Sequence, residues 1–283
     1  MAHKTRGGIE HKPRPWLVVL GALGIVVFFG FPYALMAVTS LKTRLEVTDL
    51  PPAYFPATPR FENYLMVWST EVNPAASLLA TAVISLGATV LVLVIATPAA
   101  YYVARFRFPG RLVFLLLVLC TQMLQPTVLA VGLFQEFSGW KGYAVWGALI
   151  LINAAFNLSF AIWIMQAFFA SVPKEIDEAA LIDGLGRLQT MFRISLPLVW
   201  PGIVTAIIFV FVNSWNEFAA ALVLVQDNNL QPLTVSMPRF LGLYIQDWQY
   251  LFAVALIAIV PVIVLFGIIE KRLIGGLTAG AGR

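Results

Sequence analysis

Long runs without a charged side chain constrain this sequence more than any other feature. The first extends from Pro15 to Leu41, and a helix needs about 20 apolar residues to cross a bilayer. Comparable apolar blocks recur over residues 77–100, 112–134, 144–169, 202–225 and 250–269. Because a backbone in lipid must satisfy its own hydrogen bonds, we expect each block to be a helix. The sequence therefore predicts an all-α integral membrane protein with six transmembrane helices, the first over residues 16–40.

The composition excludes several classes of function. The chain is 60% hydrophobic, and its two histidines, His3 and His11, both precede the first apolar block. A catalytic triad or a histidine metal site in the body of the protein therefore has no imidazole. The single cysteine, Cys120, excludes an internal disulfide, and no Gly-x4-Gly-Lys-Ser/Thr phosphate loop occurs. We expect neither an enzyme nor a metal site, and no catalytic residues.

The basic residues predict the orientation. We assign thirteen of the 18 to the side of the amino terminus and five to the other side, and cytoplasmic loops are the more basic ones. Both termini are therefore expected in the cytoplasm, and the charge needs no nucleic-acid partner to explain it. The thirteen are Lys4, Arg6, Lys12, Arg14, Arg105, Arg107, Arg111, Lys174, Arg187, Arg193, Lys271, Arg272 and Arg283, and the five are Lys42, Arg44, Arg60, Lys141 and Arg239.

This orientation divides the chain into segments. We expect a basic cytoplasmic tail over residues 1–15, followed by the first transmembrane helix and an outer loop over 16–76. A transmembrane core over 77–270 contains a polar cytoplasmic loop at 171–197, and residues 271–283 form a second cytoplasmic tail. The first apolar block is too long for the core of a signal peptide and has no convincing cleavage site, so we expect it to stay uncleaved.

The polar loop at residues 171–197 holds seven charged residues in a chain that is only 11% charged. Local signals predict a helix, a turn and a second amphipathic segment. Pro173 suits a first helical turn, and the acids that follow it favour the positive end of a helix. Gly184 is expected to end the helix in a left-handed conformation, and Pro197 to mark the return to the membrane. Such a loop is available to dock on a partner in water, or to lie on the membrane surface as an ordinary amphipathic loop.

Three short motifs in this loop carry a resemblance to a known family. Glu178-Ala179-Ala180, Asp183-Gly184 and Ile194-Ser195-Leu196-Pro197 together resemble the EAA loop of permease subunits of bacterial ABC importers. The resemblance implies a type I importer permease fold, in which this loop forms a coupling helix that inserts into a groove of a cytoplasmic ATPase. It implies that Glu178 anchors the loop there, that Ala179 and Ala180 allow close contact, and that Gly184 makes the turn.

Further segments are similar to permeases of carbohydrate importers, in particular to the shorter, six-helix permease of maltose-type systems. These segments are Thr39–Lys42, Phe55-Pro56, Glu62–Tyr64, Trp215–Phe218 and Gly276–Ala281. The resemblance implies two ATPase subunits that bind ATP and magnesium, a second homologous permease, and an extracytoplasmic sugar-binding protein, lipid-anchored or periplasmic. It also implies a prokaryotic inner membrane, no cofactor in this chain, and a sugar held mainly by the other permease.

Polar residues inside the expected spans are the remaining candidates for function. The fifth span contains Asn213, Trp215, Asn216 and Glu217, and polar groups in a membrane usually face a cavity or a partner. We expect them to line a translocation pathway or gate, or alternatively to hold helices together. Weaker candidates are Gln122, Gln125, Asn153 and Asn157. A different class also stays open, a proton-coupled secondary transporter that uses Glu217.

Overall fold

The computed structural model describes residues 15–49, 51, 53–123, 127–242 and 246–280, and they are mostly helical. Among them the only β-structure is an isolated bridge between Leu241 and Gln246. Most of the expected amino-terminal tail (1–15), Gln125 in the third expected span and the last residues of the expected carboxy-terminal tail lie outside the described residues. The prediction of an all-α membrane protein is confirmed.

Five helical stretches among the described residues are long and apolar enough to cross a bilayer, and one of them consists of two helices, α11 and α12. They are α1 (Pro15–Ser40), α4 (Pro74–Arg105), α7 (Ala144–Ser171), the pair α11 (Trp200–Trp215) and α12 (Ala219–Leu224), and α14 (Trp248–Gly280). Five of the six expected spans are thus present. The helix of α14 continues past residue 270, where we expected a tail.

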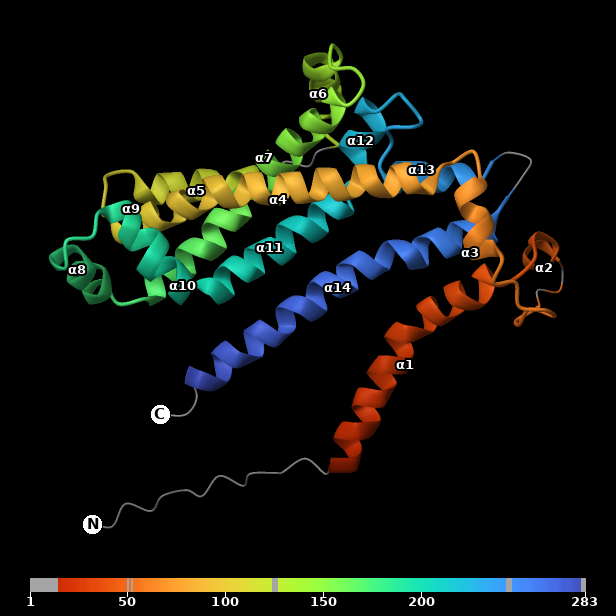
Figure 1. Cartoon of the computed structure of the whole chain (residues 1–283), viewed down its shortest axis with the longest axis horizontal. Coiled ribbons are helices and arrows are strands. Elements are labelled where there is room, and N and C mark those ends of the chain that lie inside the picture. Colours follow the sequence, from red (N-terminus) through yellow and green to blue (C-terminus); the bar gives the residue numbers. More distant parts are fainter. Residues whose placement is uncertain (1–14, 50, 52, 124–126, 243–245, 281–283) are drawn as a thin grey trace, which may run out of the picture.

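The third expected span, over 112–134, is not one helix. The chain forms α5 (Arg111–Thr121) and, after a gap in the description, α6 (Ala130–Phe137). At about 1.5 Å per residue α5 is too short to cross the bilayer alone. In Figure 1 α6 stands away from the long helix α4. The Thr121 hydroxyl donates to the Val118 carbonyl at 2.7 Å, and the backbone N–H of Gln122 donates to the Leu119 carbonyl. Each bond spans three residues, where an α-helical bond spans four, and together they end the α-helix.

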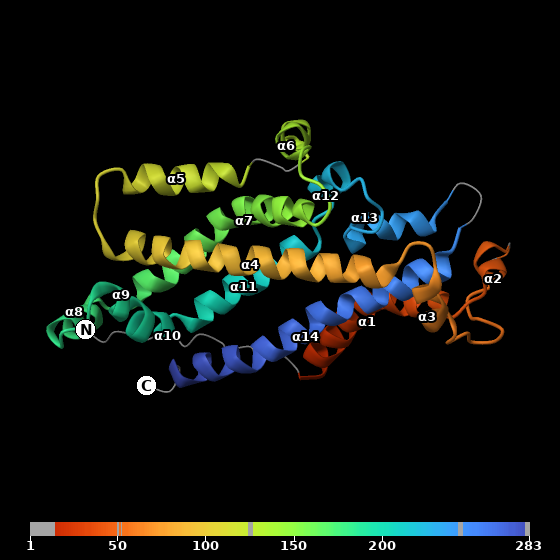
Figure 2. The same cartoon turned by 45° about the horizontal axis from the view of Figure 1, so that its top comes forward.

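The core lies where α4, α7 and α11 pack together. Several alanines lie at these contacts, and Ala96, Ala100, Ala161 and Ala206 are fully buried. Small residues let membrane helices approach closely. Gly202 has the same role, because a Cβ atom there would lie 2.3 Å from the Phe168 ring. Helix α1 packs instead against α14, apart from this group (Figure 2).

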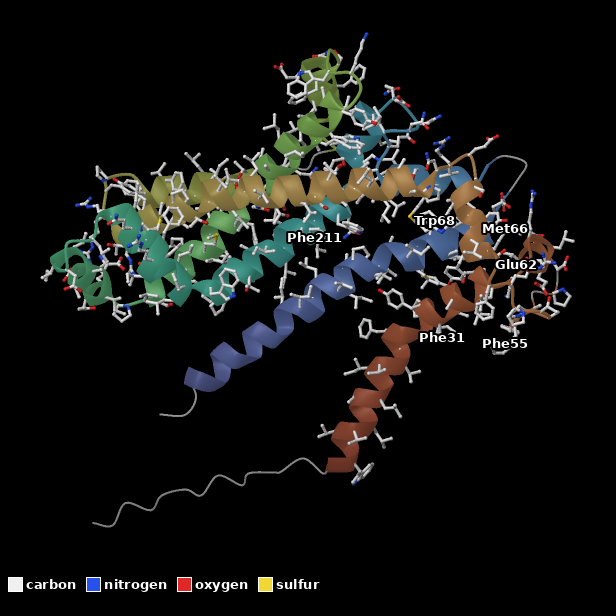
Figure 3. The ribbon with its side chains drawn as sticks, in the orientation of Figure 1. Phe31, Phe55, Glu62, Met66, Trp68 and Phe211 are labelled. Atoms are coloured by element: carbon white, nitrogen blue, oxygen red, sulfur yellow. The ribbon has the colours of Figure 1, made fainter. Side chains whose placement is uncertain are left out.

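Short helices occupy the two ends of the molecule (Figure 1). One end carries α2 (Arg44–Thr48) and α3 (Asn63–Met66), where Figure 3 places Phe55, Glu62 and Met66. The opposite end carries the loop elements, which are α8 (Lys174–Ile182), α9 (Arg187–Thr190), a π-helical turn η2 (Met191–Ser195) and α10 (Leu196–Leu198). The short helix α13 (Leu233–Ser236) precedes the 3-10 turn η3 (Met237–Phe240), and η1 (Val67–Ser69) follows α3.

Candidate coupling loop and membrane cavity

The loop at residues 171–197, which we call the coupling loop, begins where α7 ends. Val172 is extended, with φ −80° and ψ 129°, as expected for a residue that precedes proline. Pro173 is also extended, with ψ 140°, and precedes α8. The prediction that Pro173 lies inside the first helical turn is therefore wrong by one position, because α8 begins at Lys174.

The turn that ends α8 depends on Gly184. Its φ of +85° lies in the left-handed region, where a side chain is unfavourable. The Leu185 amide donates to the Ala180 carbonyl and the Gly184 amide to the Leu181 carbonyl, each at 3.1 Å. This pattern closes the helix end and directs the chain into α9.

Asp177 is the acid of the loop that the structure buries. It is 7% exposed, and its Oδ2 atom lies 2.7 Å from Nε of Arg105, the last residue of α4. The Tyr101 hydroxyl donates to Oδ2 at 3.1 Å, and the Ser195 hydroxyl donates to Oδ1 at 2.6 Å. Sequence reasoning considered Asp177 only as a favourable acid near a helix start. The available signal was the pair Tyr101 and Arg105, four residues apart and therefore on one face of α4.

The residues of the EAA motifs divide between an inner and an outer side of the loop. Glu178, Ala179 and Asp183 are exposed, whereas Ala180 is buried within the loop. Ala180 therefore packs within this chain, while the expected close contact of the two alanines with an ATPase stays a prediction. Of the later residues, Ile194 and Leu196 are half-buried and Pro197, in the first turn of α10, is exposed.

Large apolar side chains also remain exposed on the coupling loop. Ile182 is 86% exposed, Leu188 68% and Phe192 56%, and Leu181 is exposed as well. We call these four residues the exposed apolar set. They belong to α8, α9 and η2, which lie together at one end of the molecule (Figure 1). Apolar side chains gathered on so polar a segment are typical of a protein interaction site.

The fifth expected span is broken at residues 216–218, between α11 and α12. Glu217 lies in this break and not on a continuous helix, so the expected helical position of Glu217 is wrong. Its carboxylate accepts from the Ala220 amide at 2.7 Å and from the Ala221 amide at 3.2 Å. A carboxylate that satisfies the first amides of a helix is a capping group, and here it starts α12.

A cavity of about 410 Å³ opens beside this break. The structure brings Asn213 and Glu217 together on its wall, whereas Trp215 and Asn216 line a second cavity of about 340 Å³ on the side of α1 and α14. The first cavity, which we call the amide cavity, is also lined by polar Thr121, Gln122, Asn153 and Asn157 and by aromatic Phe156, Phe209 and Phe218. Cavities of this size hold small molecules.

The three asparagine amides of this cavity share one geometry. The side-chain nitrogens of Asn153, Asn157 and Asn213 each donate to the carbonyl one turn earlier, at 2.8 to 3.0 Å. Each nitrogen therefore has one of its two N–H groups bonded within its own helix, and the amide oxygen is available as an acceptor for a ligand. Amide oxygens accept hydrogen bonds from hydroxyl groups, and the phenylalanine rings add apolar surface.

The fold defines a class, a multi-pass helical membrane protein with a folded polar loop at one end. A model of the family described as "binding-protein-dependent transport system inner membrane component" matches residues 93–276. This match covers more than half of the chain, and the chain belongs to that family of ABC importer permeases.

Two relatives and one solved structure illustrate the similarity. The sulfoquinovosyl glycerol transport system permease protein of Agrobacterium fabrum is 34% identical over 250 residues, which are 88% of this chain and 87% of the relative. The trehalose/maltose transport system permease protein of Thermococcus litoralis is 31% identical over 270 residues, 94% and 95% of the two chains. A chain in the crystal structure of a bacterial ABC transporter involved in import of the acidic polysaccharide alginate has a similar fold. Its TM-score is 0.76 at 20% identity, with 94% of this chain and 99% of that chain covered.

Proposed function

We propose that this chain is one permease subunit of an ATP-driven importer for a sugar or a related carbohydrate, and that its coupling loop docks on a separate ATPase. The observation that carries the proposal is the exposed apolar set. Ile182, Leu188 and Phe192 project from a loop whose other side is held in place by the buried Asp177. A rigid segment with an exposed apolar surface suits insertion into a groove of a soluble partner.

The remaining partners follow from the family. Two ATPase copies bind ATP and magnesium, a second homologous permease completes the pathway, and an extracytoplasmic sugar-binding protein delivers the ligand. Both termini and the coupling loop lie in the cytoplasm of a prokaryotic cell, with the membrane as the inner membrane. The basic residues support this orientation, because Arg105, Lys174 and Arg187 belong to elements at the coupling-loop end.

Coupling requires that the permease has two conformations, inward-open and outward-open, and that the ATPase favours one of them when it binds ATP. A ligand shifts such an equilibrium only by its difference in affinity for the two states. The coupling loop is the element through which that difference reaches the membrane helices. Glu178 and the exposed apolar set supply the contact with the ATPase.

The amide cavity supports a carbohydrate as the transported molecule. Its wall combines amide oxygens from Asn153, Asn157 and Asn213 with the rings of Phe156 and Phe209. Hydroxyl groups of a sugar donate to the oxygens, and its C–H face packs on the rings. Asn213 and Glu217 thus belong to the proposed pathway, while Trp215 and Asn216 border the second cavity and belong to a gate beside α1 and α14.

Purification of the tagged chain from native membranes tests the docking role. Wild type is expected to bring down an ATPase with a phosphate loop and a second permease. Ile182→Asp places a charge within the exposed apolar set and is expected to lose the ATPase at least about tenfold while it keeps the second permease. Leu45→Asp is the matched control, because Leu45 is also a strongly exposed apolar residue, in α2 at the opposite end. Equal recovery of the ATPase with all three chains would contradict docking through the coupling loop.

The energy source separates this function from proton-coupled transport through Glu217. Cells are given radiolabelled maltose, trehalose or sulfoquinovosyl glycerol with a proton uncoupler while ATP is maintained. We expect uptake to persist under these conditions and to survive Glu217→Gln in part, because glutamine keeps an oxygen that can cap α12. Uptake abolished by the uncoupler at full ATP would favour the secondary transporter.

A further inference from the structure

We propose that the ion pair between Asp177 and Arg105 is the joint that makes the coupling loop and α4 move as one rigid body. This inference rests on the proposed function, since it concerns the step between ATPase docking and helix movement. Asp177 and Arg105 are positioning residues and touch neither the transported molecule nor ATP.

The geometry is that of a joint because the Asp177 carboxylate contacts groups from two other elements. Its Oδ2 atom meets Arg105 Nε at 2.7 Å and the Tyr101 hydroxyl at 3.1 Å, both from α4. Its Oδ1 atom meets the Ser195 hydroxyl of η2 at 2.6 Å. The side chains of Arg105 and Asp177 are only 6% and 10% exposed. Both carboxylate oxygens are therefore engaged, and the loop is tied to α4 at one end and to its own return segment at the other.

Arg105 also connects α4 to the end of α7. Its Nη1 atom donates to the Val172 carbonyl at 2.7 Å, just where α7 gives way to the coupling loop. In return, the Lys174 ammonium of α8 donates to the Arg105 carbonyl at 3.4 Å. The Tyr101 ring, one turn earlier, packs edge-on against Phe169 of α7 with centroids 5.5 Å apart. The ends of α4, α7 and α8 thus meet at one guanidinium group.

No other acid of the coupling loop can serve as this joint, because Glu175, Glu178 and Asp183 are all exposed. Helix α8 itself packs mainly against α9 and η2 and has little direct packing on α4. The covalent chain transmits a displacement of α8 to α7 and, through α9, η2 and α10, to α11, but not to α4. Separating a buried ion pair in a low dielectric costs much free energy. The pair between Asp177 and Arg105 therefore transmits the displacement of α8 to α4.

Distance measurements in the purified complex test the joint directly. Nitroxide labels are placed at Glu175→Cys on α8 and Val94→Cys on α4, both exposed positions, in a Cys120→Ser background. The distance between them is measured with and without ATP and vanadate. We expect the same narrow distribution of label-to-label distances with and without ATP and vanadate. In Asp177→Asn the distribution broadens or shifts between the states, and the exchanged pair Asp177→Arg with Arg105→Asp restores the narrow one.

The control is Arg107→Gln, an exposed arginine two residues beyond Arg105, which is expected to leave the distance as in wild type. A wild-type distance that changes with ATP, or an Asp177→Asn distance as narrow and constant as wild type, overturns the joint. If Asp177→Asn does not assemble, Tyr101→Phe, which removes one hydrogen bond from the same carboxylate, is measured with the same two outcomes. A wild-type chain that purifies without an ATPase overturns the proposed function itself, which is a different result.

Discussion

Two regions of this molecule separate apolar helices and contain a buried or half-buried acid, but the two acids bind different kinds of partner. In the coupling loop, Asp177 pairs with Arg105 and Tyr101 of a distant helix. In the break between α11 and α12, Glu217 accepts from the amides of Ala220 and Ala221, its immediate neighbours.

The difference shows how the partner of an acid decides its mechanical role. An acid bonded to another element joins two elements, and its loss leaves an opposite charge buried. An acid bonded to the next helical turn fixes a local change of direction, and its loss costs only a cap. We therefore expect a substitution in the coupling loop to change the structure of several membrane helices. A substitution at the break between α11 and α12 should change the structure only near the amide cavity.

The largest expected effect is that of Arg105→Leu, which leaves the Asp177 carboxylate buried without its cation. Removal of one partner of a buried ion pair costs about 3–5 kcal/mol, so local opening of the loop should increase roughly 100-fold or more. Trypsin cleavage at Lys174 and Arg187 in detergent measures this opening. The double variant Arg105→Leu with Asp177→Leu should recover much of the resistance, because no charge then stays unpaired. Equal cleavage of wild type and Arg105→Leu would contradict the contrast between the two acids.

A smaller effect is expected at the turn of the coupling loop. Gly184→Ala forces a side chain into a φ of +85°, which costs about 1–2 kcal/mol. The rate of trypsin cleavage at Arg187 should rise roughly tenfold. Gly186→Ala is the matched control, because Gly186 has an ordinary φ of −73° and room for a methyl group. Equal cleavage of the two variants would show that the turn does not depend on the left-handed residue.

At the break, Glu217→Ala removes the cap of α12 and should cost about 1 kcal/mol. Hydrogen exchange at the amides of Ala220 and Ala221 should accelerate several-fold, with the coupling loop unchanged. Glu217→Gln keeps an acceptor and should protect both amides more than alanine does. Faster exchange in the coupling loop would show that the break is not local.

The smallest effect is expected at the opposite end, where Glu46 caps α2. Hydrogen bonds from the backbone amides of Thr43 and Ala57 lower the pKa of Glu46 below its ordinary value of 4.5. The stabilisation is therefore complete above about pH 4.5 and is lost as the pH falls through the lower folded pKa. Protection factors of the α2 amides, corrected for intrinsic exchange, should fall in that window. In Glu46→Gln they should not depend on pH, and an identical pH dependence would contradict the assignment.

Hydropathy, together with residues that typically start or end helices, predicted much of this architecture. The length of the apolar blocks predicted five of the spans. The acidic residues predicted the helix that begins the coupling loop, and Gly184 predicted the turn that ends this helix. Which acid of the coupling loop faces inward was missed, because Asp177 and Glu178 are neighbours of nearly the same chemistry. That choice depends on Arg105, far away in sequence. The breaks in the third and fifth spans were also missed. Local hydrogen bonds end α5 at Thr121 and start α12 after Glu217, where composition alone would predict continuous helices.

A cross-link tests most directly whether the coupling loop contacts an ATPase. In a Cys120→Ser background, Ile182→Cys is cross-linked in native membranes through a short maleimide reagent, and the product is sequenced. The expected partner is a peptide from an ATPase with a phosphate loop, while Leu45→Cys at the opposite end gives none. If Leu45→Cys captured the ATPase and Ile182→Cys did not, the orientation and the docking role would both be contradicted.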